Sequence, residues 1–550
     1  MTKNHQIALT NYSLKKSDSR SHQPSDSRLH KPSDPRLHQH SNSQLHQHSD
    51  SRLHRSSSFR QKLPLLGLFL GFLFISFTTT AIIKNFRPKK LEYSLDTDTC
   101  ASNLTLNNLE KNTICDFLVG KIHFKDFKIA EKTTFDTLDD DFLIKIELPV
   151  TDFYNSLVDL PLEKANDSDF LAQNHITFIN LDQLTPDKKL LSLNQYYYLD
   201  NQTSGARFTK LIIETQDFDQ TAQLKEALKS LKIKPQIPPT SFVETGVTAL
   251  TRRLTLKLNQ VGNGAYFGEK LVDFLRTKTH VHISNEVSFK DHCQGGYQTM
   301  VLCADWRTLD TITTIGAHIV ELTGNHNNDA GIENNLKTIA KYRSLGLKTV
   351  GGGENLAEAR KPLDVNEFIR LLAYNQSTSS VVNGQLATDT TPGANPYSEE
   401  QVKLDLQKAK SENKFTIINI QYFECYAYPD RPIAFPACDK PITNQQQFFR
   451  HLIDLGADMV VGTSAHQPQT FELYHGKPIY YGLGNLFFDQ IYWPDTKRSL
   501  ILTHYFDNGK YLQTRISPTI YDETFQTRLL NTEESQVFLT RLLNASPKGN

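Results

Sequence analysis

An uncharged apolar stretch, Leu63–Ile83, constrains this chain more than any other feature of its sequence. It is 21 residues long, and about 20 apolar residues are enough to cross a bilayer as a helix. A cleavable signal peptide has a shorter apolar core close to the start of the chain. This stretch begins at residue 63 and is followed directly by Lys84 and Arg87. We therefore predict an uncleaved signal-anchor, a single transmembrane helix over residues 63–83.

Residues 1–62 form a basic, repetitive arm with 11 basic and four acidic residues, a net charge of +7. Five tandem octads run from Ser17 to Ser56, and each has a histidine in sixth position. The apolar content is too low to offset the entropy cost of ordering, so we predict a disordered tail. Imidazole is a common metal ligand, so the repeat is either a metal-collecting tract or a solvated low-complexity tail. We favour the solvated tail.

The charge balance limits the partners of this chain. The whole chain has 60 Lys+Arg and 60 Asp+Glu, which argues against a protein bound to nucleic acid along its length. Residues 91–550 carry a net charge of −11. Basic residues flank the apolar stretch on both sides, so local charge alone does not orient it. The longer basic arm favours a cytoplasmic amino end and an extracytoplasmic body at the cell membrane.

All six cysteines follow the apolar stretch, and they fall into neighbouring couples. Exported proteins tolerate disulfides, whereas cytosolic proteins seldom have them. Six cysteines permit 15 connectivities, and six unpaired thiols are the alternative. We predict three bridges: Cys100–Cys115, Cys293–Cys303 and Cys425–Cys438.

The body divides into two predicted domains. Residues 91–239 have strand-like runs and one helical run, which predicts a small extracytoplasmic α+β domain without a catalytic constellation. The runs are Phe142–Val150, Ile176–Leu181, Lys210–Glu214 and the helical Thr221–Leu231. The proline-rich stretch Lys234–Pro239 predicts a linker.

From 240 to 530 helical and strand patterns alternate, which predicts a layered α/β domain. The expected helices are Gly264–Arg276, Asp305–Thr314, Ile332–Leu345, Glu399–Lys410 and Asn444–Leu455. The expected strands are His280–Ser284, Ile319–Thr323, Phe368–Ala373, Thr416–Tyr422 and Met459–Thr463. In such domains the residues of a site collect at strand ends.

The loop after the strand at 319–323 combines Asn325, His326 and Asp329. An amide oxygen, an imidazole and a carboxylate can serve a divalent metal, or a site that binds phosphate or carboxylate and donates a proton. Turn chemistry explains glycine, asparagine and aspartate here, but it gives His326 no role.

Other predicted strands also end in polar residues. Glu286 has a structural alternative as a helix cap or surface acid, and His466 has one as a capping or core histidine, but together with the first loop these residues strengthen the prediction of a site. The residues are Glu286, Gln421, Glu424, His466 and Asn485.

The blocks Asn285-Glu286, GNHNNDAG (324–331), GADMVVGTSAHQPQ (456–469) and GKPIYYGLGNLFFDQ (476–490) occur in this order. They resemble the CapA family of bacterial capsule and poly-γ-glutamate biosynthesis proteins, within the calcineurin-like metallophosphoesterase superfamily. The resemblance covers about 240–500. It implies a metallophosphoesterase-like four-layer α/β/β/α sandwich, export, and a role in cell-surface polymer assembly. It places the site on Glu286, Asn325, His326, Asp329 and His466.

Two departures from the family pattern weaken the implied metal centre. The opening strand of the family ends in Gly-Asp, but Glu244–Arg252 contains no aspartate. The family's His-Trp-Gly-x-Glu block is replaced by Gln421-Tyr422-Phe423-Glu424-Cys425. A two-metal hydrolase holds its cations about 3.5–4 Å apart, normally with a bridging carboxylate. The remaining donors suffice for one divalent metal or none: Glu286, Asn325, His326 and His466.

Arg252 lies where the family has an acid, and a guanidinium attracts carboxylates and phosphates. We expect it to bind an anionic cell-surface polymer together with Gln421, Glu424 and Asn485. Two functions follow. One is an anchored hydrolase or transferase in which His326, Glu286 and Asp329 are catalytic. The other is a catalytically degenerate binding or scaffold protein of polymer export, within a polymer-synthesis membrane complex.

Overall fold

The computed structural model describes residues 95–105, 111–124, 126–135, 142–215, 218–233, 238–294, 301–376, 385–422, 438–491 and 493–547. The chain separates into a unit of residues 1–90 and a unit of residues 91–550. Within the described ranges, no helix is long and apolar enough to cross a membrane. The predicted tail and the predicted anchor Leu63–Ile83 lie outside those ranges, so both stay predictions.

Residues 95–233 build a mixed sheet in the order β1-β2-β8-β3-β5, with β6 paired to β3. Its long strands are antiparallel neighbours, and each expected strand between residues 142 and 214 is present. The strands are β1 (Leu104–Thr105), β2 (Phe127–Thr134), β3 (Phe142–Asp152), β5 (Thr177–Ile179), β6 (Lys188–Leu190) and β8 (Arg207–Thr215). A separate parallel pair joins β4 (Asp159–Leu160) to β7 (Ser192–Leu193).

Helices α2, α3 and α6 pack on one end of this sheet around a common apolar cluster that includes Leu118, Phe127 and Leu224. The predicted disulfide Cys100–Cys115 is confirmed, and it joins α2 to α3. The helices are α2 (Thr97–Ser102), α3 (Lys111–Leu118), α4 (Ser168–Gln173), α5 (Tyr198–Asn201) and α6 (Phe218–Ala227).

The rest of the chain contains two large sheets. One has the order β15-β14-β11-β9-β25-β26-β27, with β10 paired to β11 and β24. Its strands are β9 (Thr240–Glu244), β10 (Val247–Thr248), β11 (His280–Asn285), β14 (Ile319–Glu321), β15 (Lys348–Val350), β24 (Asn485–Phe487), β25 (Arg498–Asp507), β26 (Lys510–Ile520) and β27 (Arg528–Leu529).

The second sheet has the order β17-β18-β20-β21-β23-β22. Its strands are β17 (Leu363–Asp364), β18 (Ile369–Asn375), β20 (Phe415–Gln421), β21 (Met459–Gly462), β22 (Phe471–Tyr474) and β23 (Lys477–Tyr480). Two short pairs lie apart from both sheets: β12 (Phe289–Lys290) with β13 (Ala304–Asp305), and β16 (Gly352–Gly353) with β19 (Gly393–Ala394).

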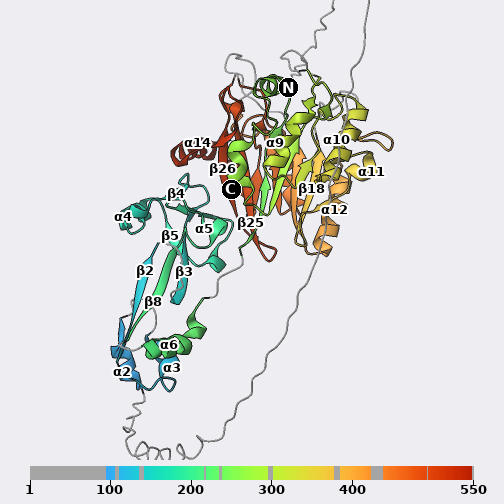
Figure 1. The fold of residues 1–550 in the computed structure, drawn as a ribbon. Helices are drawn as coiled ribbons and strands as arrows, with labels where there is room; N and C mark the ends of the chain where they lie inside the picture. Colours follow the sequence, from blue (N-terminus) through green and yellow to red (C-terminus); the bar gives the residue numbers. More distant parts are fainter. Residues whose placement is uncertain are drawn as a thin grey trace, which may run out of the picture. The chain divides into compact units, whose positions relative to one another are not determined.

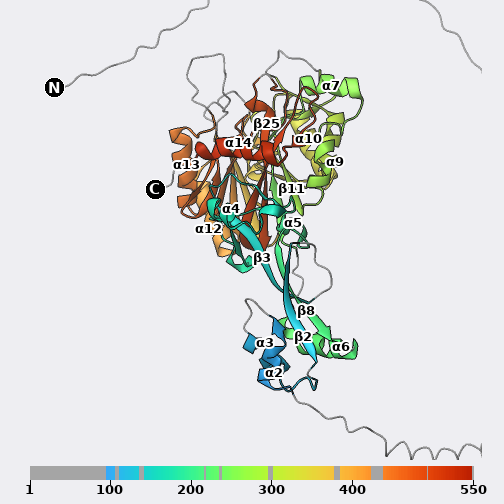
Figure 2. The same ribbon diagram turned by 90° about the vertical axis from the view of Figure 1, so that its left-hand side faces the viewer.

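Three apolar clusters stack these elements into four layers. One cluster joins the first sheet to α7–α10, a second lies between the two sheets, and a third joins the second sheet to α12 and α13. Figure 2 shows α12 and α13 on one side of the strands and α9 and α10 on the other. The four-layer order expected from the sequence is therefore present (Figure 1).

The helices of these layers are α7 (Arg253–Val261), α8 (Val272–Leu275), α9 (Leu309–Thr314), α10 (Ile332–Ser344), α11 (Leu356–Ala359), α12 (Glu399–Ser411) and α13 (Thr443–Asp454). A last helix, α14 (Thr532–Asn544), adds Phe538, Leu539 and Leu542 to the cluster between the sheets.

One expected helix is wrong over most of its length. Residues 264–268 form turns, and only a 3-10 turn at Glu269–Leu271 and α8 follow. Two glycines in this segment, Gly264 and Gly268, are poor helix formers, and the side chain of Asn263 accepts from the backbone N–H of Ala265, which favours a turn here. A helix that the sequence analysis did not expect, α7, lies just before this segment.

Candidate functional site

Parallel strands of both sheets bring the expected site residues to one set of strand ends. β10, β11 and β14 are parallel neighbours in the first sheet, and β20 and β21 are parallel neighbours in the second. Thr248 is paired with Asn285 on one side and with Phe487 on the other. The segments that follow β11 and β24 therefore emerge beside the end of β10, as expected for a site at strand ends.

A buried carboxylate, Glu321, ties the two sheets together beneath these strand ends. It accepts hydrogen bonds from Nδ2 of Asn419 at 2.8 Å, Oγ1 of Thr463 at 3.0 Å and Oγ1 of Thr323, and contacts Nε2 of His282 at 2.9 Å. Burial raises the pKa of Glu321. The His282 contact and the hydrogen bonds from Thr323 and Asn419 outweigh burial and hold this pKa below its usual value. Because Asn419 lies in β20 and Thr463 directly follows β21, Glu321 joins the strand ends of the two sheets that carry the site.

His326 and Asp329 form a close pair in the loop after β14. Nδ1 of His326 lies 2.6 Å from Oδ2 of Asp329, and both side chains are largely buried. The backbone N–H of Leu302 also donates to Oδ2 of Asp329, at 2.9 Å. The carboxylate therefore orients the imidazole, and the second predicted disulfide, Cys293–Cys303, is confirmed next to the donor Leu302.

Glu286 lies against the start of the same loop. Its side chain is buried, and its backbone N–H donates to the carbonyl of Thr248 at 2.9 Å. A Cβ atom on Gly324 would lie 2.5 Å from Cα and 2.8 Å from Cγ of Glu286. Only glycine leaves room for this approach, so the GNHNND loop needs Gly324 to bring Asn325 and His326 beside Glu286.

Gln421 ends β20 and contacts the loop from the second sheet. Its Nε2 donates to Oδ1 of Asn325 at 3.1 Å, and both side chains are buried. The structure thus brings Gln421 to the residues with which the sequence grouped it. Glu424 lies in 423–437, outside the described residues.

His466 and Asn485 meet on the other side of β10. Nδ1 of His466 lies 3.0 Å from Oδ1 of Asn485, and the imidazole stacks on Phe488 at 5.4 Å between ring centroids. Asn485 in turn donates to Oε1 of Gln490 and to the carbonyl of Thr496. This network fixes the imidazole plane of His466.

Arg252 forms an ion pair with Asp489, which the sequence analysis did not predict. Its Nε lies 3.0 Å from Oδ2 and 3.1 Å from Oδ1 of Asp489, and its guanidinium lies 4.8 Å from the centre of the Phe488 ring. Asp489 is almost fully buried, whereas the Arg252 side chain retains 14% of its exposure. The positive charge expected to attract a substrate is therefore largely offset by Asp489.

The described donors do not fit a two-metal centre. Among the described residues, no three His, Cys, Asp or Glu side chains lie close enough to hold a metal ion. Two of the expected donors contact other side chains, Nδ1 of His326 with Asp329 and Oδ1 of Asn325 with Gln421. A carboxylate at one imidazole nitrogen is also common in histidines that bind a metal through the other nitrogen. A bridging carboxylate at the end of the opening strand is missing, because β10 ends at Thr248 and is followed by Ala249.

Sequence reasoning did not select three residues that shape this site. Glu321 lies within the predicted strand 319–323, and the sequence analysis gave Phe488 no role. Asp489 stood out only as a possible oxygen donor. The pairing of Asp489 with Arg252 joins residues 237 positions apart, so the only sequence signal was the presence of both charges at predicted strand ends.

Two stacked sheets between helices, with polar residues at the strand ends, define a mixed α/β domain consistent with the metallophosphoesterase-like class. A family model described as "Bacterial capsule synthesis protein PGA_cap" matches residues 245–490. With the relatives described next, this match supports the resemblance of residues 245–490 to the CapA family.

Several curated proteins are similar to this part of the chain. Capsule biosynthesis protein CapA of Bacillus anthracis is 27% identical over 249 residues, which cover 42% of this chain and 58% of the relative. PGA biosynthesis protein CapA of Bacillus subtilis is 23% identical over 232 residues, 42% and 57% of the two chains. A probable polyglutamine synthesis accessory protein of Mycobacterium tuberculosis is 27% identical over 186 residues, 32% and 46%. The chain spans little more than half the length of the two CapA proteins.

Proposed function

We propose that this chain is an accessory protein of capsule or poly-γ-glutamate-type synthesis, and that its strand-end site hydrolyses or transfers segments of an anionic polymer. The names of its relatives, which concern capsule, PGA and polyglutamine synthesis, support this role in polymer synthesis. The His326–Asp329 contact of 2.6 Å carries the catalytic part of the proposal.

The pair has the arrangement of an oriented acid–base group. With Nδ1–H donating to Asp329, the imidazole has its lone pair on Nε2, the nitrogen that accepts a proton. In hydrolysis, His326 takes a proton from the attacking water and returns one to the leaving group, while Asp329 stabilises the imidazolium. In transfer, a hydroxyl or amine of a second polymer chain takes the place of water. Glu286, beside this loop, is the second candidate acid or base.

We expect groups of the site, and not the overall charge of the body, to attract the polymer. The net charge of −11 over residues 91–550 repels a polyanion, so attraction has to come from the site. Arg252 keeps part of its surface exposed while it contacts Asp489. Gln421, Asn485 and Glu424 are the proposed polar contacts to the polymer.

We further propose that the chain is held in the cell membrane by Leu63–Ile83, with its amino end cytoplasmic and its body outside. The confirmed disulfides Cys100–Cys115 and Cys293–Cys303 support an oxidising location for the body. Cys438 is disulfide-bonded too, and its expected partner Cys425 lies outside the described residues. An anchored protein of this kind would act within a polymer-synthesis membrane complex.

Incubation of the purified full chain with poly-γ-glutamate, and separately with a phosphoester, tests the proposal. We expect the polymer length distribution to change, as measured by size-exclusion chromatography. Because the donor set does not fit a two-metal centre, we expect this change to survive dialysis against a chelator. Metal analysis of the same preparation would measure whether a single divalent cation is bound. No change in polymer length, with or without added divalent metal, would contradict the catalytic proposal.

A second function, polymer binding without turnover, is favoured by one observation. Several polar groups of the site are already engaged with one another, as in the Gln421–Asn325 and Arg252–Asp489 contacts. If the chain binds poly-γ-glutamate at low salt and leaves its length unchanged, the scaffold function replaces the catalytic one.

A further inference from the structure

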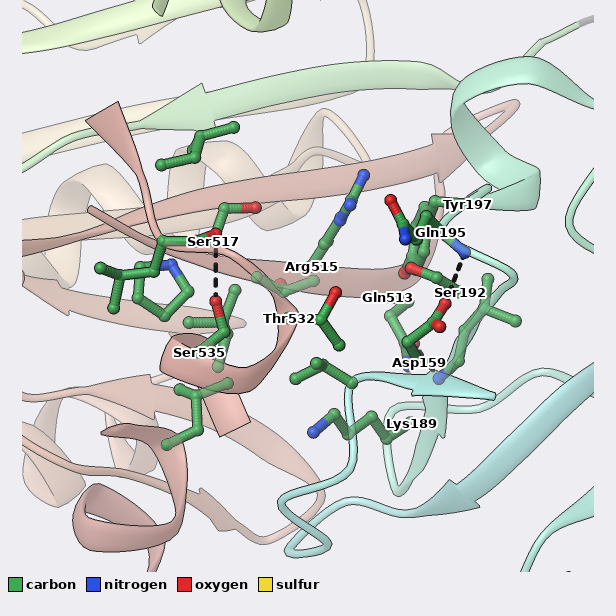
Figure 3. Close-up of a pocket in the computed structure, with 18 of the residues that line it drawn as sticks. Asp159, Lys189, Ser192, Gln195, Tyr197, Gln513, Arg515, Ser517, Thr532 and Ser535 are labelled. Carbon is green, nitrogen blue, oxygen red and sulfur yellow. Dashed lines mark hydrogen bonds between the residues drawn. The ribbon is translucent and has the colours of Figure 1, made fainter. Parts of the chain in front are cut away.

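A second cavity lies away from the strand-end site, between residues 153–197 and the segment from β26 to α14. Its volume is about 510 Å³, which lies in the range of about 300–1,000 Å³ typical of small-molecule sites. Figure 3 shows Lys189 and Asp159 on one side of the cavity and Arg515, Thr532 and Ser535 on the other.

Direct contacts hold the two walls together. Gln513 of β26 accepts from the backbone N–H of Leu190 and donates to the carbonyl of Lys188, so β26 is tied to β6. Phe153 and Phe471 make an edge-to-face contact at 5.7 Å across the boundary. The cavity is therefore a formed feature of the fold and has walls from both segments.

Lys189 is the unusual residue of this cavity. Its Nζ donates to the backbone carbonyl of Asn155 at 2.7 Å, and among the described residues it has no carboxylate partner. Desolvation alone lowers its pKa, to about 7. Its side chain is half-buried, and an anionic group in contact with Nζ would favour the protonated amine.

The other charged groups of the cavity are already engaged or exposed. Arg515 contacts Oδ2 of Asp200 at 2.6 Å, and Asp200 also binds Lys278. Asp159 accepts from the backbone N–H of Gln195 at 2.7 Å, and burial raises its pKa. Glu533 is exposed in the first turn of α14. Asp200 is thus shared by two cations, and Lys189 is the lining cation without a carboxylate contact among the described residues.

The rest of the lining has polar side chains such as Ser192, Gln195 and Thr532 and, beside them, an apolar wall. This wall combines aromatic and aliphatic side chains from both segments: Phe153, Leu190, Phe471, Ile516, Leu530 and Leu539. The apolar wall suits the apolar body of a small ligand.

We propose that this cavity binds a small molecule with one carboxylate and an apolar body, whose carboxylate contacts Lys189 and whose body lies against the apolar wall. The proposal is independent of polymer chemistry at His326, since the two sites share no residue. It assigns to the segment before the CapA-like part a role in ligand binding that sequence reasoning did not find.

Calorimetric titration of the full chain in detergent with 2-naphthoate tests the proposal, with 2-naphthalenemethanol as the neutral probe. We expect one molecule of naphthoate per chain. Lys189→Met should weaken naphthoate binding about tenfold or more, the scale of one charge-assisted hydrogen bond. The alcohol should bind wild type more weakly than naphthoate by a similar factor.

Two further variants distinguish naphthoate binding in the cavity from effects that a substitution has elsewhere in the protein. Lys188→Met is the matched control, because Lys188 precedes Lys189 in β6 and does not line the cavity; it should bind naphthoate as wild type does. Thr532→Trp fills the cavity from an exposed position and should abolish binding while the circular dichroism spectrum stays unchanged. Equal naphthoate affinity in wild type and Lys189→Met, or no binding to wild type, would overturn the proposal.

Discussion

The Arg252 guanidinium contacts the Asp489 carboxylate at the strand-end site, with Nε 3.0 Å from Oδ2. The carboxylate side chain is 1% exposed and the arginine side chain 14%. The two residues are 237 positions apart, so the contact also fixes the segment after β24 against the start of α7. Arg252 therefore has a structural role beside any contact with substrate.

Removal of this arginine should destabilise the protein. Arg252→Met leaves the Asp489 carboxylate buried without its cation, and breaking a buried pair in this way costs about 3–5 kcal/mol. The double variant Arg252→Met/Asp489→Asn should regain part of that loss, because it removes the unpaired charge. Chemical denaturation measures both free energies of unfolding.

Lys270→Met is the control for this pair, because Lys270 is exposed in the turn before α8. It should change stability by less than about 0.5 kcal/mol. The same free energy of unfolding for Arg252→Met and wild type would show that the contact does not stabilise the fold.

Glu321→Gln should weaken the connection between the sheets. The glutamine amide would place an N–H₂ group among donors that now point at a carboxylate, and such a mismatch costs on the order of 1–3 kcal/mol. Thermal or denaturant unfolding near neutral pH measures the loss.

The effect of Glu321→Gln should depend on pH. Because the folded-state pKa of Glu321 is below its usual value, the carboxylate stabilises the protein at pH values above the unfolded-state pKa. That contribution disappears as the pH falls through the folded-state pKa. The stability difference between wild type and Glu321→Gln should therefore shrink on acidification, and a difference that grows would contradict the account.

The two confirmed disulfides should contribute similarly to stability but differently to the site. Cys293–Cys303 and Cys100–Cys115 close loops with sequence separations of 10 and 15, and chain entropy predicts about 3 kcal/mol for each. Replacement of both cysteines of either bridge by serine should lower the free energy of unfolding by that amount.

Only the bridge next to Leu302 should affect function. Leu302 donates to Asp329, so loss of Cys293–Cys303 should lower polymer turnover beyond its effect on folding, and loss of Cys100–Cys115 should not. Equal turnover in the two double-serine variants at a temperature where both are folded would contradict this role.

The sequence predicted the parts of the fold that follow from local patterns. The apolar runs Ile319–Thr323 and Met459–Thr463 correspond to β14 and β21. A short apolar run between two helical patterns is typical of a buried strand in a layered domain. It also placed His326 and Asp329 in one loop, because they are three residues apart.

The sequence could not predict contacts between distant segments. The close approach of the Arg307 carbonyl to Gly264 leaves no room for a side chain there, and no local pattern records this contact. The Arg252–Asp489 pair and the bridge from Glu321 to Asn419 likewise depend on how the sheets stack. The interpretation of Arg252 as a substrate-binding cation was therefore incomplete.

The most direct test of the central claim is the rate of poly-γ-glutamate turnover by His326→Ala and Asp329→Asn. The matched control is His475→Asn, at an exposed turn residue with a φ of 52° that asparagine tolerates. If His326 is the acid–base group, His326→Ala should lower the rate by about 100-fold or more, Asp329→Asn should lower it less, and His475→Asn should leave it unchanged. Turnover by His326→Ala at the wild-type rate would contradict the account.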